Sequence, residues 1–125
     1  MKIAISSGHG LYVSGTKDLI DEVTEARKGT DRVALILKSN GIDVNVFHDN
    51  TSRTQNDNIN TIIKHHNSLQ RNLDVSIHFN SSDGGTKDAG LGVETLYHTG
   101  EQPSKQIASK VSRKISGASG LNLRR

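Results

Sequence analysis

The chain of 125 residues contains no cysteine, no tryptophan and a single proline. Without cysteine it can form neither disulfides nor thiolate metal sites, so any metal ion must be held by histidine and carboxylate side chains. Six histidines are present, which makes such a site possible. A chain of this length can build one hydrophobic core but not two, so we predict a single domain over residues 1–125.

Long apolar runs are also missing. No stretch approaches the length that spans a membrane, and the first twenty residues lack the basic segment and the uninterrupted apolar run of a signal peptide. We therefore expect no membrane insertion and no export signal.

Aromatic residues and excess charge are scarce as well. Only two tyrosines and two phenylalanines are available to stack on bases, and the net charge of +3 is mild. The basic residues form no dense stripe, so we expect no nucleic-acid partner, although a mildly basic chain suits an anionic polymer.

The spacing of apolar residues predicts four strands and three helices. Alternating apolar positions indicate strands, and apolar positions three or four residues apart indicate helices. The "NG" at residues 40 and 41 is typical of a helix end, and Pro103 is typical of a first helical turn. The predicted strands cover residues 2–6, 42–49, 73–79 and 92–98, and the predicted helices cover residues 19–40, 56–67 and 103–116.

This order of elements predicts an α/β fold, a three-layer sandwich in which a mostly parallel central sheet is flanked by helices. Ligands of such sheets collect at the carboxyl ends of the strands. The loop after the first strand and the end of the third strand are therefore the places where a site is expected. The glycine-rich segment 81–92 is long enough to be functional, and residues 82–92 are predicted either to shape the peptide-binding groove or to form an ordinary exposed loop.

Three side chains are candidates for a metal site. His9 follows the first strand and His78 ends the third, so both should lie at the same rim of the sheet. Glu22 lies in the first turns of the first helix, where a carboxylate suits the positive end of the helix dipole. Two histidines, one glutamate and a water form a known catalytic zinc set. The spacing leaves an alternative open, in which His9 is a loop residue, His78 a hydrogen-bonded core histidine and Glu22 a solvated charge.

Four segments together resemble a known family. They are the opening "KIAISSGHG", the pair "DE" at residues 21 and 22 heading a long helix that ends in "NG", the strand "VSIHFNSS", and "GVETLYH". In this order they resemble the zinc-dependent N-acetylmuramoyl-L-alanine amidases, particularly the lysins of phages and bacilli, over essentially all 125 residues.

The resemblance implies both a cofactor and a reaction. Zinc would be bound by His9, Glu22 and His78, and the substrate would be peptidoglycan, hydrolysed at the amide that joins the lactyl group of muramic acid to L-alanine. Glu22 is preferred to Glu25 because its interval to Gly41 matches that of the family's ligand. Without a signal peptide, we expect such an enzyme to be made in the cytoplasm and to reach the wall after membrane breach or lysis.

The catalytic glutamate of the family has no match in this chain. In the family it lies on a strand well after the third helix, whereas this sequence stops at Arg125. Glu94 is the best internal candidate, although the family has a glutamate there besides its catalytic one, which favours a structural role. We therefore expect that the chain is a fragment lacking the last strand and helix. A non-catalytic, zinc-containing peptidoglycan-binding module is the alternative to an active enzyme.

Three further features remain open. Asn80 shares the strand face of His78 and is predicted either to contact substrate or to cap a turn. His48 ends the second strand, where it would contact substrate or form a hydrogen bond at the rim. The segment "GLYVSGTK" at residues 10–17 nearly spells a P-loop, but its lysine and hydroxyl residues are swapped, which makes nucleotide binding the weakest of the three functional hypotheses.

Overall fold

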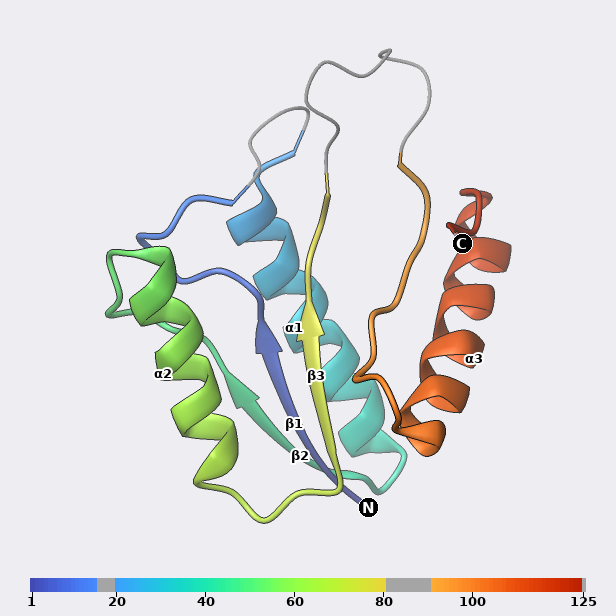
Figure 1. Ribbon diagram of the computed structural model, residues 1–125, viewed down its shortest axis with the longest axis horizontal. Coiled ribbons are helices and arrows are strands. Elements are labelled where there is room, and N and C mark those ends of the chain that lie inside the picture. The colour runs from blue at the N-terminus through green and yellow to red at the C-terminus, as the bar shows by residue number, and fades with distance from the viewer. Residues whose placement is uncertain (16–19, 81–90, 125) are drawn as a thin grey trace. The chain divides into compact units, whose positions relative to one another are not determined.

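The computed structural model describes residues 1–15, 20–80 and 91–124. These residues form three strands and three helices (Figure 1). The elements are β1 (Lys2–Ser7), α1 (Glu22–Ser39), β2 (Asp43–Phe47), α2 (Gln55–Asn67), β3 (Leu73–Ile77) and α3 (Gln102–Ser119). Contacts within the chain fall into two compact units, Met1–Asn80 and Ser81–Arg125, which are described one after the other. A single domain over residues 1–125 stays a prediction.

The first unit is a parallel sheet with the strand order β2-β1-β3. The connection from β1 to β2 and the connection from β2 to β3 cross the sheet in opposite directions. Because such connections are right-handed, α1 and α2 lie on opposite faces of the sheet (Figure 1). The predicted α/β sandwich with a parallel sheet is confirmed.

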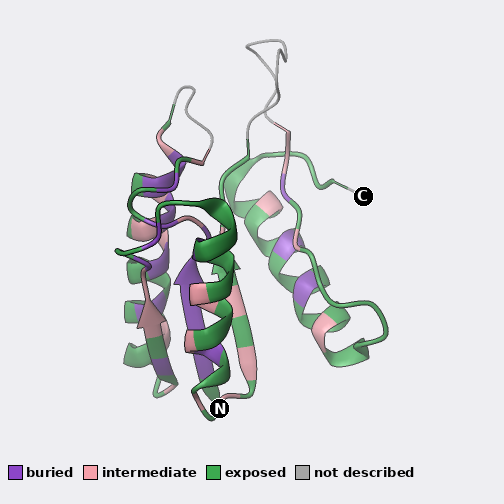
Figure 2. Ribbon diagram, turned by 60° about the vertical axis from the view of Figure 1, so that its left-hand side comes forward, coloured by how far each residue is buried: buried purple, intermediate pink, exposed green. Residues whose placement is uncertain are grey.

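The hydrophobic core of the first unit lies between the sheet and α1. Ile3 and Ile5 of β1 pack with Val44 of β2 and Ala34 of α1. The central strand β1 is buried along nearly its whole length (Figure 2). Other apolar residues pack around this cluster at the alternate strand positions and on the helix, namely Leu37, Ile42, Val46, Leu73, Val75 and Ile77.

Polar and aromatic contacts connect α2 to the other face of the sheet. The His65 ring stacks on Phe47 with the centroids 4.0 Å apart, and its Nε2 lies 2.8 Å from Oδ1 of Asn45. The adjacent His66 instead places its Nδ1 2.8 Å from Oδ1 of Asp74 in β3. Neighbouring residues of a helix point about 100° apart, so these two histidines contact different strands.

Both ends of α1 follow from local sequence. Asp21 caps the helix, because its side chain accepts a hydrogen bond from the backbone N–H of Thr24 at 3.1 Å. The helix therefore begins at Glu22 rather than near Leu19, a residue that lies outside the described ranges. At the other end Gly41 adopts a φ of 77°, which confirms the predicted "NG" helix end.

The second unit consists of an extended segment, α3 and the residues after it. The predicted strand 92–98 is wrong as a strand, because only Val93 is paired, in one parallel bridge with Leu123. Two 2.8 Å hydrogen bonds make that bridge, from the Val93 N–H to the carbonyl of Asn122 and from the Arg124 N–H to the carbonyl of Val93. A strand needs such pairing over several residues, and the segment has it at one.

The helix of the second unit is longer than predicted. It continues to Ser119 and ends at Gly120, which has a φ of 74° in the left-handed region. The Ser112 hydroxyl donates a 2.7 Å hydrogen bond to the hydroxyl of Thr95, joining the helix to the extended segment. None of the helices in the described ranges is long and apolar enough to cross a membrane.

A buried aspartate joins the loops that follow β1 and β2. The Asp49 carboxylate accepts hydrogen bonds from the backbone N–H groups of Thr51 and Ser52 and from Nδ2 of Asn58. Its carbonyl accepts one from the N–H of Leu11 at 2.8 Å. Burial by itself raises the pKa of Asp49, but the hydrogen bonds outweigh burial and hold this pKa well below the ordinary value.

We predict that Asp49→Ala lowers the free energy of unfolding by about 1–3 kcal/mol at neutral pH, because Asn58 and two backbone N–H groups lose their acceptor. The folded-state pKa of Asp49 is depressed, so its contribution is complete above the pKa of an aspartate in the unfolded chain, about 3.9. It shrinks as the pH falls below that value and is gone below the folded-state pKa.

Urea unfolding of the wild type and the variant at pH 7 and pH 3 measures this effect. The difference between the two proteins should be smaller at pH 3. The exposed Asp43 provides a control, since Asp43→Ala removes a carboxylate that is not buried. A difference for Asp49→Ala that is equal at both pH values would contradict the prediction.

Candidate metal centre

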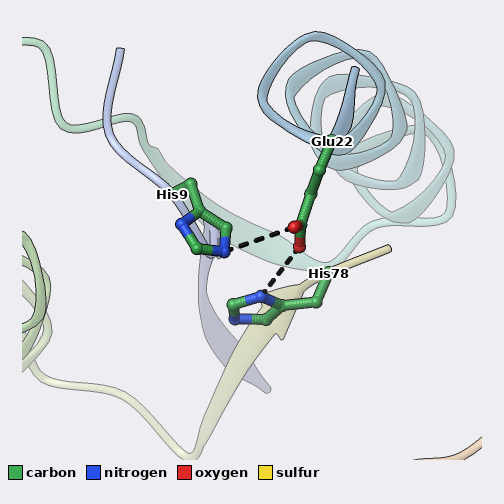
Figure 3. Close-up of side chains that lie close together, drawn as sticks. All are labelled: His9, Glu22 and His78. Carbon is green, nitrogen blue, oxygen red and sulfur yellow. Dashed lines mark hydrogen bonds and ion pairs between the residues drawn. The ribbon is translucent and has the colours of Figure 1, made fainter. Parts of the chain in front are cut away.

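Three side chains from different elements meet at one edge of the first unit (Figure 3). Nε2 of His9 lies 3.4 Å from Oε2 of Glu22, and Nδ1 of His78 lies 3.2 Å from Oε1 of the same carboxylate. One possible ligand atom from each residue lies within 4.8 Å of the other two. In the described ranges these are the only three histidine or acidic side chains that gather closely enough to hold a metal ion.

The sheet brings the two histidines together. In the parallel pair of β1 and β3, Ser7 lies opposite Ile77, so the residues just beyond them leave the sheet at the same edge. The N–H of Gly8 donates a 2.9 Å hydrogen bond to the carbonyl of Ile77, which extends the pairing by one step. His9 and His78 each follow directly from this contact.

Glu22 is withdrawn from water much more than the histidines. Its side chain is 4% exposed, against 15% for His9 and 47% for His78. The backbone N–H of Phe79 donates a 3.0 Å hydrogen bond to its Oε1. A buried carboxylate is costly unless it is paired or coordinates a metal, and a position in the first turn of α1 lowers that cost.

The arrangement fits a zinc ion. Zinc takes imidazole nitrogens and carboxylate oxygens at about 2.0–2.2 Å in tetrahedral geometry, which places neighbouring ligand atoms roughly 3.3–3.6 Å apart. The two histidine–carboxylate distances, 3.4 and 3.2 Å, are close to that spacing but end on different oxygens of Glu22, and one ligand atom from each residue lies within 4.8 Å of the other two. The absence of thiolates and the mixture of nitrogen and oxygen ligands favour zinc over softer ions.

Two glycines are required by the close packing of the cluster. A Cβ atom on Gly8 would overlap with the imidazole ring of His78, and one on Gly15 would overlap with the Glu22 carboxylate and lie 2.9 Å from Cδ2 of His9. The sequence showed these residues only as parts of glycine-rich loops. The glycine directly before His9 is the one signal that could have indicated a close approach at this point.

Glu25 and Glu94 each form an ion pair with a basic side chain. Glu25 forms a 2.8 Å ion pair with Lys28 on the surface of α1, while Glu22 faces the two histidines. Glu94 belongs to the second unit, where its Oε1 lies 3.1 Å from Nη1 of Arg124. A catalytic role of Glu94 stays a prediction, as does metal binding by the three clustered residues.

Some predicted features lie in part outside the described residues. Asn80 is described and exposed, two positions after His78, and its contact with substrate stays a prediction. Most of the loop 82–92, predicted either to shape a groove or to be an ordinary exposed loop, is outside the described ranges, and so are residues 16 and 17 of the P-loop-like segment.

Comparison with known proteins identifies the family. The sequence matches the family described as N-acetylmuramoyl-L-alanine amidase over residues 3–125, a range that contains all three residues of the cluster. No curated protein matches the chain. The family match supports a peptidoglycan amidase in general, in agreement with the resemblance found in the sequence. The chain therefore belongs to the N-acetylmuramoyl-L-alanine amidase family.

Proposed function

We propose that this chain hydrolyses the amide bond between the lactyl group of N-acetylmuramic acid and L-alanine in peptidoglycan, using zinc held by His9, Glu22 and His78. The observation that carries the proposal is the cluster itself. A chain that matches an amidase family gathers two histidines around a buried carboxylate at the edge where parallel sheets bind ligands.

The three side chains have different roles in such a site. His9 and His78 offer ring nitrogens that face the carboxylate, and Glu22 supplies the single negative charge. When bound, a zinc ion with these ligands polarises an amide carbonyl and lowers the pKa of its water. The Phe79 N–H holds one carboxylate oxygen of Glu22 in place, which fixes the orientation of that ligand.

A second candidate function is a zinc-containing module that binds peptidoglycan without hydrolysing it. Amide hydrolysis needs a group that takes a proton from water and delivers it to the leaving amine. The described cluster contains one carboxylate, that of Glu22, which is assigned to the metal. Glu94 lies 3.1 Å from Arg124, and among the described residues the hydrolytic proposal assigns no acid–base group.

We predict that the purified chain binds one zinc ion and that His78→Ala abolishes binding, because the variant loses one of three ligands. Elemental analysis of metal-loaded and dialysed protein measures this. His65→Ala is a matched control, since His65 of α2 packs against β2, where it contacts Phe47 and Asn45 and not the cluster. Wild-type protein that retains no zinc would contradict the proposed metal site.

We also predict that the zinc-loaded chain releases new N-terminal L-alanine from purified cell walls and that His78→Ala does not. Labelling of free amino groups, followed by identification of the labelled residue, detects this product. New reducing sugar ends would instead indicate cleavage of the glycan. A zinc-loaded chain that binds walls but exposes no new N-terminal alanine would favour the non-catalytic module.

Gly8→Ala should weaken zinc binding at least about tenfold, because its methyl group displaces the ring of His78. Competition with a chromogenic chelator measures the affinity. Gly29→Ala is the matched control, since a Cβ there meets only Cγ2 of Ile77 at an ordinary 3.7 Å. The control should leave zinc binding unchanged and stabilise α1 by about 0.5–1 kcal/mol. Equal zinc affinity of Gly8→Ala and wild type would contradict the close packing.

A further inference from the structure

A chain of three polar side chains ends beside the candidate metal centre. The hydroxyl of Ser7, the last residue of β1, lies 2.9 Å from Nδ1 of His48. Nε2 of the same ring lies 3.0 Å from Oδ1 of Asp31 in α1. The contacts thus join the central strand, the residue after β2 and the helix that carries Glu22.

The direction of these hydrogen bonds follows from the chemistry of the partners. An ionised carboxylate only accepts, so His48 donates to Asp31 from Nε2. In a neutral imidazole the other nitrogen is then an acceptor, and the Ser7 hydroxyl donates to it. The same hydroxyl lies 3.4 Å from the carbonyl oxygen of His9, a longer contact than the one to His48.

The order serine, histidine, aspartate resembles a hydrolytic triad, but the burial does not suit nucleophilic attack. Ser7 is completely buried, so no substrate carbonyl can reach its hydroxyl. The side chain of Asp31 is 65% exposed, whereas the acid of a hydrolytic triad is buried. The three residues are therefore suited to holding a position and not to attacking a substrate.

The position that they hold is that of the turn carrying His9. On one side Gly8 is tied to β3 through the carbonyl of Ile77, directly before His78. On the other side Ser7 is tied to His48. Only Gly8, which has no side chain to restrain it, lies between Ser7 and His9. The direction of the His9 ring therefore depends on how firmly Ser7 is held.

We propose that His48 and Asp31 are positioning residues that act through the Ser7 hydroxyl to orient His9 for metal binding. The proposal rests on the zinc site proposed above. It assigns a role to two side chains that touch neither the metal ligands nor a substrate, and it predicts that the metal centre responds to changes on the far side of β1.

Zinc affinity and the visible spectrum of the cobalt-loaded chain test the proposal. Ser7→Ala and His48→Ala should each weaken zinc binding about 10–100-fold and shift the cobalt absorption bands, because the orientation of one ligand is released. The zinc affinity of the double variant should equal that of whichever single variant binds zinc less tightly, since both changes break the same connection. His65→Ala is the control and should change neither quantity.

Asp31 provides a test that does not depend on altering the buried core. Asp31→Ala removes an exposed side chain and should weaken zinc binding, whereas Asp31→Asn keeps an oxygen that accepts from His48 and should restore it. A merely structural effect would not distinguish these two variants in the cobalt spectrum.

Three results would overturn the proposal. Zinc affinities of Ser7→Ala and His48→Ala within twofold of wild type would refute it while leaving the zinc site intact. Additive losses in the double variant would show two independent effects instead of one connection. Absence of zinc binding by the wild-type chain would refute the metal site and the positioning role together. The first and the last result therefore distinguish failure of this inference from failure of the proposed function.

Discussion

The buried carboxylate of Glu22 is the constraint on which the site depends. A carboxylate with 4% of its side chain exposed is expensive to keep ionised, and the chain offsets this cost at several points. Its place at the start of α1 lets the helix dipole favour the negative charge, and the Phe79 N–H donates to it directly. The ring nitrogens of His9 and His78 lie 3.4 and 3.2 Å from its two oxygens. The zinc ion that we propose would neutralise this carboxylate and take a nitrogen from each histidine.

Much of the fold could be predicted because apolar spacing reports which face of an element is buried. Ile3, Ile5 and Val75 alternate as the pattern requires, and they form the core against α1. The strand expected at 92–98 failed for a different reason. Its residues favour extended structure, but a strand exists only where a second strand pairs with it, and such a partner lies far away in sequence. The single partner of Val93 is Leu123, in a tail that no pattern had assigned.

The candidate site was predictable only where topology determined it. His9 and His78 follow parallel strands, and the rule that ligands collect at strand ends placed them together; Glu22 was preferred to Glu25 through family resemblance. Nothing in the spacing predicted that Gly8 lies against the His78 ring, because that contact depends on side-chain positions at residues seventy apart in sequence. The sequence also did not predict that Ser7 is the partner of His48, although it predicted a hydrogen bond of His48 at the rim as one of two alternatives.

The three candidate ligands differ in their exposure to solvent, so the cluster is more open on one side than on the other. Glu22 lies deepest, His9 is mostly covered, and nearly half of the His78 side chain faces solvent. Of the three side chains, His78 is therefore the one that solvent reaches most easily. Ser7, through which His48 and Asp31 are proposed to act on His9, is completely buried, whereas the Asp31 side chain at the other end of that connection is 65% exposed. The buried members of the cluster, Glu22 and His9, are therefore restrained by the packing around them, while His78 keeps a side open to solvent.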